Sequence, residues 1–239
     1  MFRKTIANKF ESKNEFRFRG HEVRRIEAFS DAVFAFAVTL LIVSLEVPKS
    51  FEELMVTMHG FFAFSVTFVL LMLIWYEQNI FFRRYGLDDL TTIILNCTLI
   101  FLVLFYVYPL KFLFTLLFNN ENSSLIMTGT DSRTLMIIYG TGYICIYLLF
   151  FLMHIHAFRK RNELELTLPE IFDTKTKIYK NFILILIGLV SIVVTLILTP
   201  EKAGMTGFIY FLIGPAFSVF FRYRDRKKNK LFPVNMSNE

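Results

Sequence analysis

Long apolar segments alternate with short polar connections along most of the chain. A helix that crosses a bilayer needs about 20 mainly apolar residues, and six segments meet this requirement. Their bounds are Ile26–Val47, Met55–Phe82, Leu90–Phe118, Leu135–Phe158, Tyr179–Leu198 and Met205–Phe221. The pattern predicts an all-α integral membrane protein with six transmembrane helices per subunit and no separate soluble domain.

The six helices divide the chain into three parts. A cytoplasmic N-terminal segment covers residues 1–25, the transmembrane domain covers 26–221, and a basic cytoplasmic tail covers 222–239. The composition agrees with this division, because 55% of the residues are hydrophobic and a typical soluble domain has about 45–50%. Residues 199–204 are rich in helix breakers and predict a tight hairpin between the last two helices.

The net charge of +6 comes from basic residues that flank the apolar segments. With the N-terminus in the cytoplasm, all but four of the 26 Lys and Arg lie on the cytoplasmic side. Lys49, Arg133 and Lys202 lie on the other side, and Lys111 lies within the third helix. The positive-inside rule therefore predicts a multi-pass protein of the cell (inner or plasma) membrane with both termini cytoplasmic. Its basic residues fit membrane lipid as a partner, and no nucleic acid is expected.

Polar side chains interrupt the cytoplasmic halves of the first three predicted helices. Unsatisfied polar groups in lipid cost several kcal/mol, so we expect Ser30, Asp31 and Asn96 to share a buried network. Arg25 and Glu77 lie nearer the membrane surface, where anchoring among lipid head groups is an equally good interpretation.

One face of the first helix is almost entirely apolar. At about 100° per residue, a single stripe contains Phe29, Ala32, Phe36, Thr39 and Val43. The Thr39 hydroxyl is its one polar group, and the charged residues of the helix point away from it. Such a face suits a helix that lines a narrow path, although plain packing against a neighbour produces the same pattern.

The start of this helix carries a recognisable motif. The stretch Arg25-Ile26-Glu27-Ala28-Phe29-Ser30-Asp31 resembles Arg-x-x-x-Phe-Ser-Asp, the first-helix signature of the transmembrane protein 175 family. This family comprises the endolysosomal potassium channel and its prokaryotic relatives. Trp75, the pair Leu95-Asn96 and Pro109 also resemble landmarks of that family.

The resemblance implies a homotetramer with a central pore lined by four copies of the first helix. Potassium would be the permeant ion, conducted passively with modest selectivity over sodium, and no cofactor or bound metal is implied. A Thr-Val-Gly-Tyr-Gly selectivity loop is absent from the sequence. The constriction positions carried over are Phe36, Thr39 and Val43, and the first-helix motif and its interhelical network comprise Arg25, Phe29, Ser30, Asp31, Trp75, Gln78 and Asn96.

Two positions depart from the family pattern. Phe36 stands where the family usually has a branched aliphatic residue, so four phenyl rings would narrow the path or stack aside. Gln78 stands where prokaryotic members usually have histidine. Its amide can hydrogen-bond to Asp31, but it cannot ionise.

Other functions leave weaker signals. The sequence contains no His-Glu-x-x-His, Gly-x-Ser-x-Gly or glycine-rich phosphate loop, so no enzyme is predicted. His154 and His156 are two residues apart and face away from each other on a helix, which argues against a metal site. A secondary transporter, which typically has internal repeats and broken helices, and a non-conducting membrane scaffold remain the alternatives to a channel.

Overall fold

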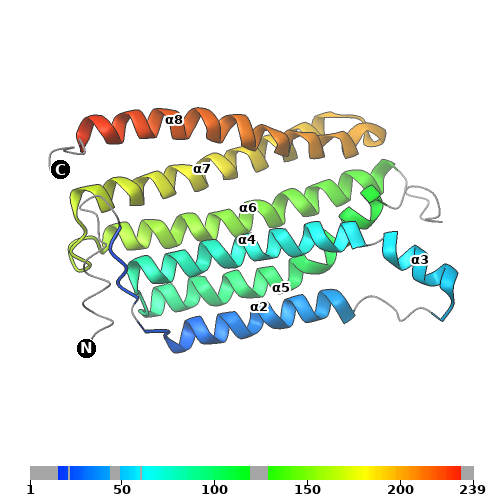
Figure 1. Cartoon of the computed structure of the whole chain (residues 1–239). Helices are drawn as coiled ribbons and strands as arrows, with labels where there is room; N and C mark the ends of the chain where they lie inside the picture. The colour runs from blue at the N-terminus through cyan, green and yellow to red at the C-terminus, as the bar shows by residue number, and fades with distance from the viewer. Residues whose placement is uncertain (1–15, 21, 44–48, 60, 119–128, 233–239) are drawn as a thin grey trace, which may run out of the picture.

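The computed structural model describes residues 16–20, 22–43, 49–59, 61–118 and 129–232, and these contain helices and connecting segments but no strand. The all-helical prediction is therefore confirmed. The elements, drawn in Figure 1, are α2 (Arg25–Val43), α3 (Phe51–His59), α4 (Phe61–Tyr85), α5 (Leu90–Phe118), α6 (Gly129–Arg159), α7 (Leu168–Ile197), the 3₁₀ helix η1 (Pro200–Leu212) and α8 (Ile213–Leu231).

Five stretches of the described chain are long and apolar enough to cross a membrane: α4, α5, α6, α7 and the continuous η1–α8. The remaining long helix, α2, lies beside them in the same bundle (Figure 1). It carries Arg25, Glu27 and Asp31 in its first two turns. The chain is a multi-pass membrane protein.

Several predicted bounds were wrong. The second long helix begins at Phe61, and Met55 belongs to the short helix α3. Helix α7 begins at Leu168 rather than Tyr179, and α8 continues to Leu231 instead of ending at Phe221. These extra turns carry charged side chains, so hydropathy alone did not include them. Residues 44–48, which include the end of the predicted first span, lie outside the described chain.

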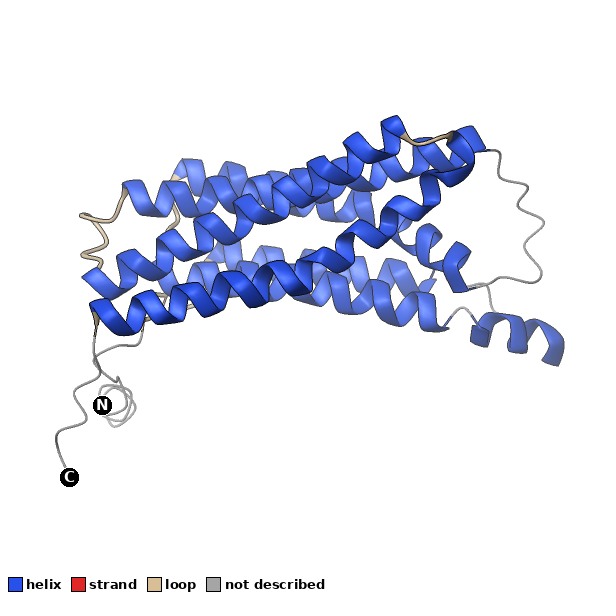
Figure 2. Cartoon of the chain, turned by 90° about the horizontal axis from the view of Figure 1, so that it is seen from above, coloured by secondary structure: helices blue, strands red, loops and turns tan. Residues whose placement is uncertain are grey.

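The long helices form a bundle with α2 at one edge and α8 at the opposite edge (Figure 1). Helices α2, α4 and α5 pack against one another, α6 packs against α7 and η1, and α5 joins the two groups by packing against α6. Figure 2 shows the same bundle from above, with its helices running lengthwise. The start of α2 and the end of α8 lie at the same end of the bundle (Figure 1).

The main core lies where α2, α4, α5 and α6 meet. It is built from aliphatic and aromatic side chains that are almost fully buried. Its central members are Phe34, Leu41, Leu71, Phe81, Tyr85, Leu99, Val103, Phe150 and Met153. In this core one face of α2 packs against α4 and α5.

Small residues allow a close helix contact between α6 and α7. A Cβ atom added at Gly188 would lie 2.6 Å from a side-chain carbon of Ile144, and one at Gly140 would lie 2.6 Å from a side-chain carbon of Ile192. Close backbone approach through small residues is a common way for membrane helices to associate. The predicted hairpin between the last two helices is present, but residues 200–204 form the start of η1.

Candidate functional site

Helix α2 has one buried side and one uncovered side. Ser30, Phe34, Ala37 and Leu41 are each 2% exposed or less. At about 100° per residue, the centre of this buried side lies about 150° around the helix from the predicted stripe. The packing of the subunit therefore turns the predicted stripe away from its own core.

The uncovered side contains Phe29, Ala32, Phe36 and Thr39, all of which are exposed. Phe36 is 57% exposed, in spite of its large apolar ring. The backbone of Val43 ends α2, but its side chain lies outside what the structure describes. A row of apolar and small residues that no described helix of the subunit covers can meet lipid or another subunit.

The Thr39 hydroxyl has its proton directed to its own helix. Its Oγ1 donates to the carbonyl oxygen of Ala35 at 3.0 Å, one turn back along α2. The oxygen lone pairs remain available on the exposed side. Thr39 thus places an oxygen acceptor in an otherwise apolar row, which is the chemistry that a partly dehydrated cation requires.

A chain of hydrogen bonds joins three helices behind this row. The Nε2 atom of Gln78 on α4 donates to Oδ1 of Asn96 on α5 at 2.5 Å. The Nδ2 atom of Asn96 donates to Oγ of Ser30 at 2.8 Å, and the Ser30 hydroxyl donates to the carbonyl of Ile26 at 2.7 Å. All three polar side chains are buried. Gln78 therefore donates to Asn96, not to Asp31 as the sequence suggested, because its position on α4 turns it toward α5.

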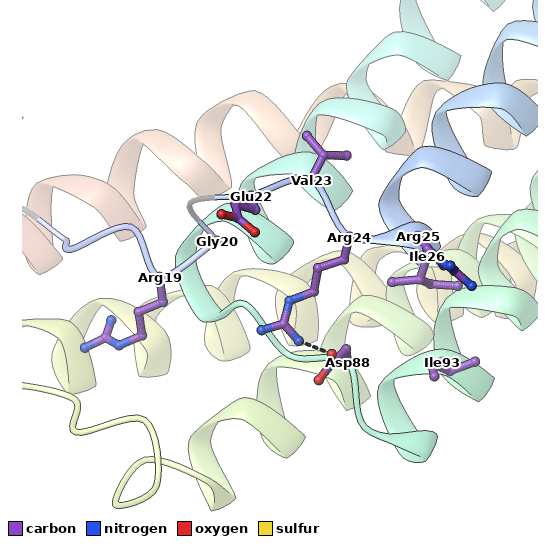
Figure 3. Close-up of a pocket in the computed structure, with 9 residues that line it drawn as sticks. All are labelled: Arg19, Gly20, Glu22, Val23, Arg24, Arg25, Ile26, Asp88 and Ile93. Carbon is purple, nitrogen blue, oxygen red and sulfur yellow. Dashed lines mark ion pairs between the residues drawn. The ribbon is translucent and has the colours of Figure 1, made fainter. Parts of the chain in front are cut away.

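Asp31 takes part in a separate contact. Its Oδ1 accepts a hydrogen bond from the indole nitrogen of Trp75 at 2.7 Å, which ties α2 to α4 a second time. Asp31 itself is exposed on the isolated subunit, so it does not share the buried network of Ser30 and Asn96. Arg25 is also exposed and borders an open groove between the N-terminal segment and the α4–α5 connection (Figure 3).

Glu77 has partners that the sequence did not indicate. Its carboxylate pairs with Lys177 at 3.0 Å and with Lys180, both on α7. Asp173, which lies closer to the start of α7, pairs with Arg224 and Lys228 of α8. Glu77 therefore links helices inside the bundle and is not a head-group anchor.

A signal for these pairs was present in the sequence. Four of the five charged residues of α7 follow a helical spacing of three, four and three residues, at Glu170, Asp173, Lys177 and Lys180, and Lys175 stands apart from them. At about 100° per residue they fall within about 80° of one another, on one side of the helix. The predicted start at Tyr179 excluded three of them, so the stripe was missed.

The two histidines lie on different contacts. The Nδ1 atom of His154 is 2.7 Å from the carbonyl oxygen of Phe150, and Nε2 of His156 is 2.8 Å from Oδ2 of Asp89. Neither contact brings the imidazole rings of His154 and His156 together.

These features define a class: a multi-pass helical membrane protein whose helix α2 is anchored on one side and uncovered on the other. The family model for the endosomal/lysosomal potassium channel TMEM175 matches residues 25–109, which run from the start of α2 to Pro109 in α5. A potassium channel of Marivirga tractuosa is 41% identical over 231 residues, covering 90% of this chain and 93% of the relative. The chain belongs to the TMEM175 family of potassium channels, and the resemblance seen in the sequence is confirmed. The family consists of ion channels, not enzymes.

Solved structures agree with this assignment. A crystal structure of a variant of the potassium channel MtTMEM175, in complex with a nanobody–MBP fusion protein, matches with a TM-score of 0.79 and 38% identity. The match covers 90% of this chain and 99% of that one. A homolog, from Chamaesiphon minutus, of the lysosomal potassium-selective channel TMEM175 matches with a TM-score of 0.56 over 82% of this chain and 95% of its own. At 23% identity, this second match supports the fold alone.

The hydrogen-bond chain makes a stability prediction. Replacing Asn96 with Ala leaves the Gln78 amide without its acceptor in a buried position, so we expect a loss of about 1–2 kcal/mol in stability. Thermal unfolding of the purified protein in detergent measures the change. Thr98→Ala is the matched control, because Thr98 is exposed on the same helix. This variant should unfold at the wild-type temperature. Equal melting temperatures for both variants would contradict a supporting role for Asn96.

Proposed function

We propose that the protein is a potassium channel that conducts passively through a homotetrameric pore. Four copies of α2 surround the central axis, with Phe36, Thr39 and Val43 at the constriction. The observation that carries the proposal is that the Phe29–Thr39 side of α2 is uncovered while the opposite side is buried in the core. The potassium-channel relatives support potassium as the permeant ion.

Apolar and polar positions would have different tasks in this pore. Four Thr39 hydroxyl groups offer a ring of oxygen atoms to a potassium ion that has lost part of its water. Rings of Phe36 and Val43 flank this layer and exclude water when they approach closely, which closes the pore. One hydroxyl layer provides few oxygen ligands, so selectivity over sodium is modest.

The end of the bundle where α2 begins and α8 ends faces the cytoplasm in this proposal, and the channel spans the cell membrane. The basic residues of the sequence concentrate in the segments that lie at this end of the bundle, as the positive-inside rule requires. Both termini are then cytoplasmic.

Currents from the purified protein in planar bilayers test the central claim. With potassium on one side and sodium on the other, we expect a passive current with a reversal potential displaced toward that of potassium. A secondary transporter would instead saturate and exchange its substrate, and a scaffold would pass no current. Either of the last two results would overturn the channel proposal.

Removing the Thr39 hydroxyl tests the selectivity layer. Thr39→Ala removes the whole ring of hydroxyl oxygens, and if that ring favours potassium over sodium by about 1 kcal/mol in total, its loss lowers the potassium-over-sodium preference about fivefold. Ion flux into liposomes measures this ratio. Thr98→Ala, which removes an exposed hydroxyl from α5, should keep the wild-type ratio. If Thr39→Ala also keeps it, Thr39 does not contribute to selectivity.

Removing the Phe36 ring tests the constriction. Phe36→Ala widens the apolar ring and allows water to enter more easily, so we expect a higher rate of potassium flux. Ile42→Ala is the control, because Ile42 is 50% exposed on the same helix but lies about 100° away from the stripe. A lower flux in Phe36→Ala, or an equal increase in both variants, would argue against Phe36 as a pore constriction.

Asp31 should act on assembly and not on permeation. Asp31→Ala removes the tie between α2 and Trp75, so we expect a lower yield of tetramer in size-exclusion chromatography and little change in single-channel conductance. Trp75→Phe removes the same hydrogen bond while keeping an aromatic ring, and should reproduce the effect. A normal tetramer with altered conductance would instead place Asp31 in the ion path.

A further inference from the structure

Residues 16–20 and 22–24 form an extended segment, the arm, that leads directly into α2. In Figure 1 the arm runs from the start of α2 across the end of the bundle toward the connection between α6 and α7. The arm was predicted only as a polar N-terminal segment. Its hydrogen bonds and ion pairs attach it to specific residues of other elements.

The strongest of these contacts is made by Glu170 in the first turn of α7. Glu170 is 1% exposed, and the Arg19 guanidinium donates to both of its carboxylate oxygens, at 3.0 and 2.8 Å. The backbone nitrogens of Arg17 and Thr167 donate to the same carboxylate at 2.9 and 2.8 Å. Four donors satisfy this buried charge, and a two-pronged arginine contact is geometrically specific.

Arg19 is held from other sides as well. Its Nε atom donates to the carbonyl of Leu164, in the α6–α7 connection, at 2.8 Å. The backbone nitrogens of Arg19 and Gly20 both donate to the carbonyl of Arg83 near the end of α4, at 3.0 and 3.1 Å. The arm thus bridges α4, the α6–α7 connection and α7.

The α4–α5 connection is shaped to receive the arm. Gly86 has a φ of 57°, which favours glycine, and a Cβ atom there would lie 3.2 Å from the carbonyl carbon and oxygen of Arg19. Any larger residue at position 86 would press on the arm.

The arm ends where α2 begins. Only residues 20–24 separate Arg19 from α2, and Arg24 forms an ion pair with Asp88 in the α4–α5 connection (Figure 3). Helix α2 itself packs against α4 and α5, whereas its arm reaches α7. The contact between Arg19 and Glu170 therefore ties the start of α2 to the other half of the bundle.

We propose that Glu170 is a positioning residue for the pore-lining helix. This inference rests on the proposed function. By holding Arg19, Glu170 keeps the start of α2 seated on its own subunit and away from the central axis. When the arm is released, the apolar Phe36 rings move together out of water, which the hydrophobic effect favours, and the pore closes. Glu170 thereby sets how often the pore is open without touching the ions.

Single-channel recording of Glu170→Gln tests this role. Glutamine keeps the size of the side chain but removes the charge that binds Arg19. We expect open probability to fall by about fivefold, while the potassium-over-sodium reversal potential stays at the wild-type value. Arg19→Gln should have the same effect, and the double variant should be no worse than either single variant, because both changes break one contact.

The matched control is Asp173→Asn, one turn further along α7. Asp173 is also buried, at 9% exposed, and pairs with Arg224 and Lys228 of α8. We expect it to lower the melting temperature without changing open probability. If Asp173→Asn and Glu170→Gln change open probability equally, the effect is general destabilisation and the inference is overturned.

A second perturbation leaves both ionic partners intact. Gly86→Ala pushes on the arm from the α4–α5 connection and should lower open probability, as Glu170→Gln does. If Glu170→Gln fails to assemble, the result with Gly86→Ala decides whether the arm positions α2. Wild-type open probability in Gly86→Ala and in any assembled Glu170→Gln would overturn the positioning role alone. A wild-type protein that passes no current would overturn the proposed function itself.

Discussion

Hydrogen bonding between Gln78, Asn96 and Ser30 decides which side of α2 faces its own subunit. Inside a bilayer, lipid is as apolar as a leucine side chain, so apolar faces of a helix gain little by choosing one neighbour over another. A buried amide or hydroxyl has no such freedom, because it must find a partner within the protein. This chain of polar groups therefore fixes the rotation of α2, and the aliphatic core follows it.

The rotation of α2 has a direct consequence for function. With Ser30 turned inward, Phe36 and Thr39 are turned outward on the uncovered side. In a single subunit these residues do not surround a pore. In a homotetramer of the kind proposed, the same side would surround the axis, and a row that looks like ordinary lipid-facing surface would become the lining of a path for ions.

Charge pairs organise the side of the bundle around α7, near the end where α2 begins. One side of α7 carries Glu170, Asp173, Lys177 and Lys180, which bind in turn the arm, α8 and Glu77 of α4. These pairs join the arm, α8 and α4 to α7. Helix α7 therefore acts as a common support for the first helix and the last.

The sequence by itself determined the helical membrane class, the family and the stripe on α2, because apolar length, helical period and the Arg25–Asp31 motif are local properties. It also indicated that Ser30 and Asn96 need partners. Only the tertiary structure decided the pairing: Gln78 with Asn96, Trp75 with Asp31, and Arg19 with Glu170 far along the chain. Such pairings depend on how each helix is rotated and how deeply it sits beside its neighbours, and spacing along one helix carries no information about either.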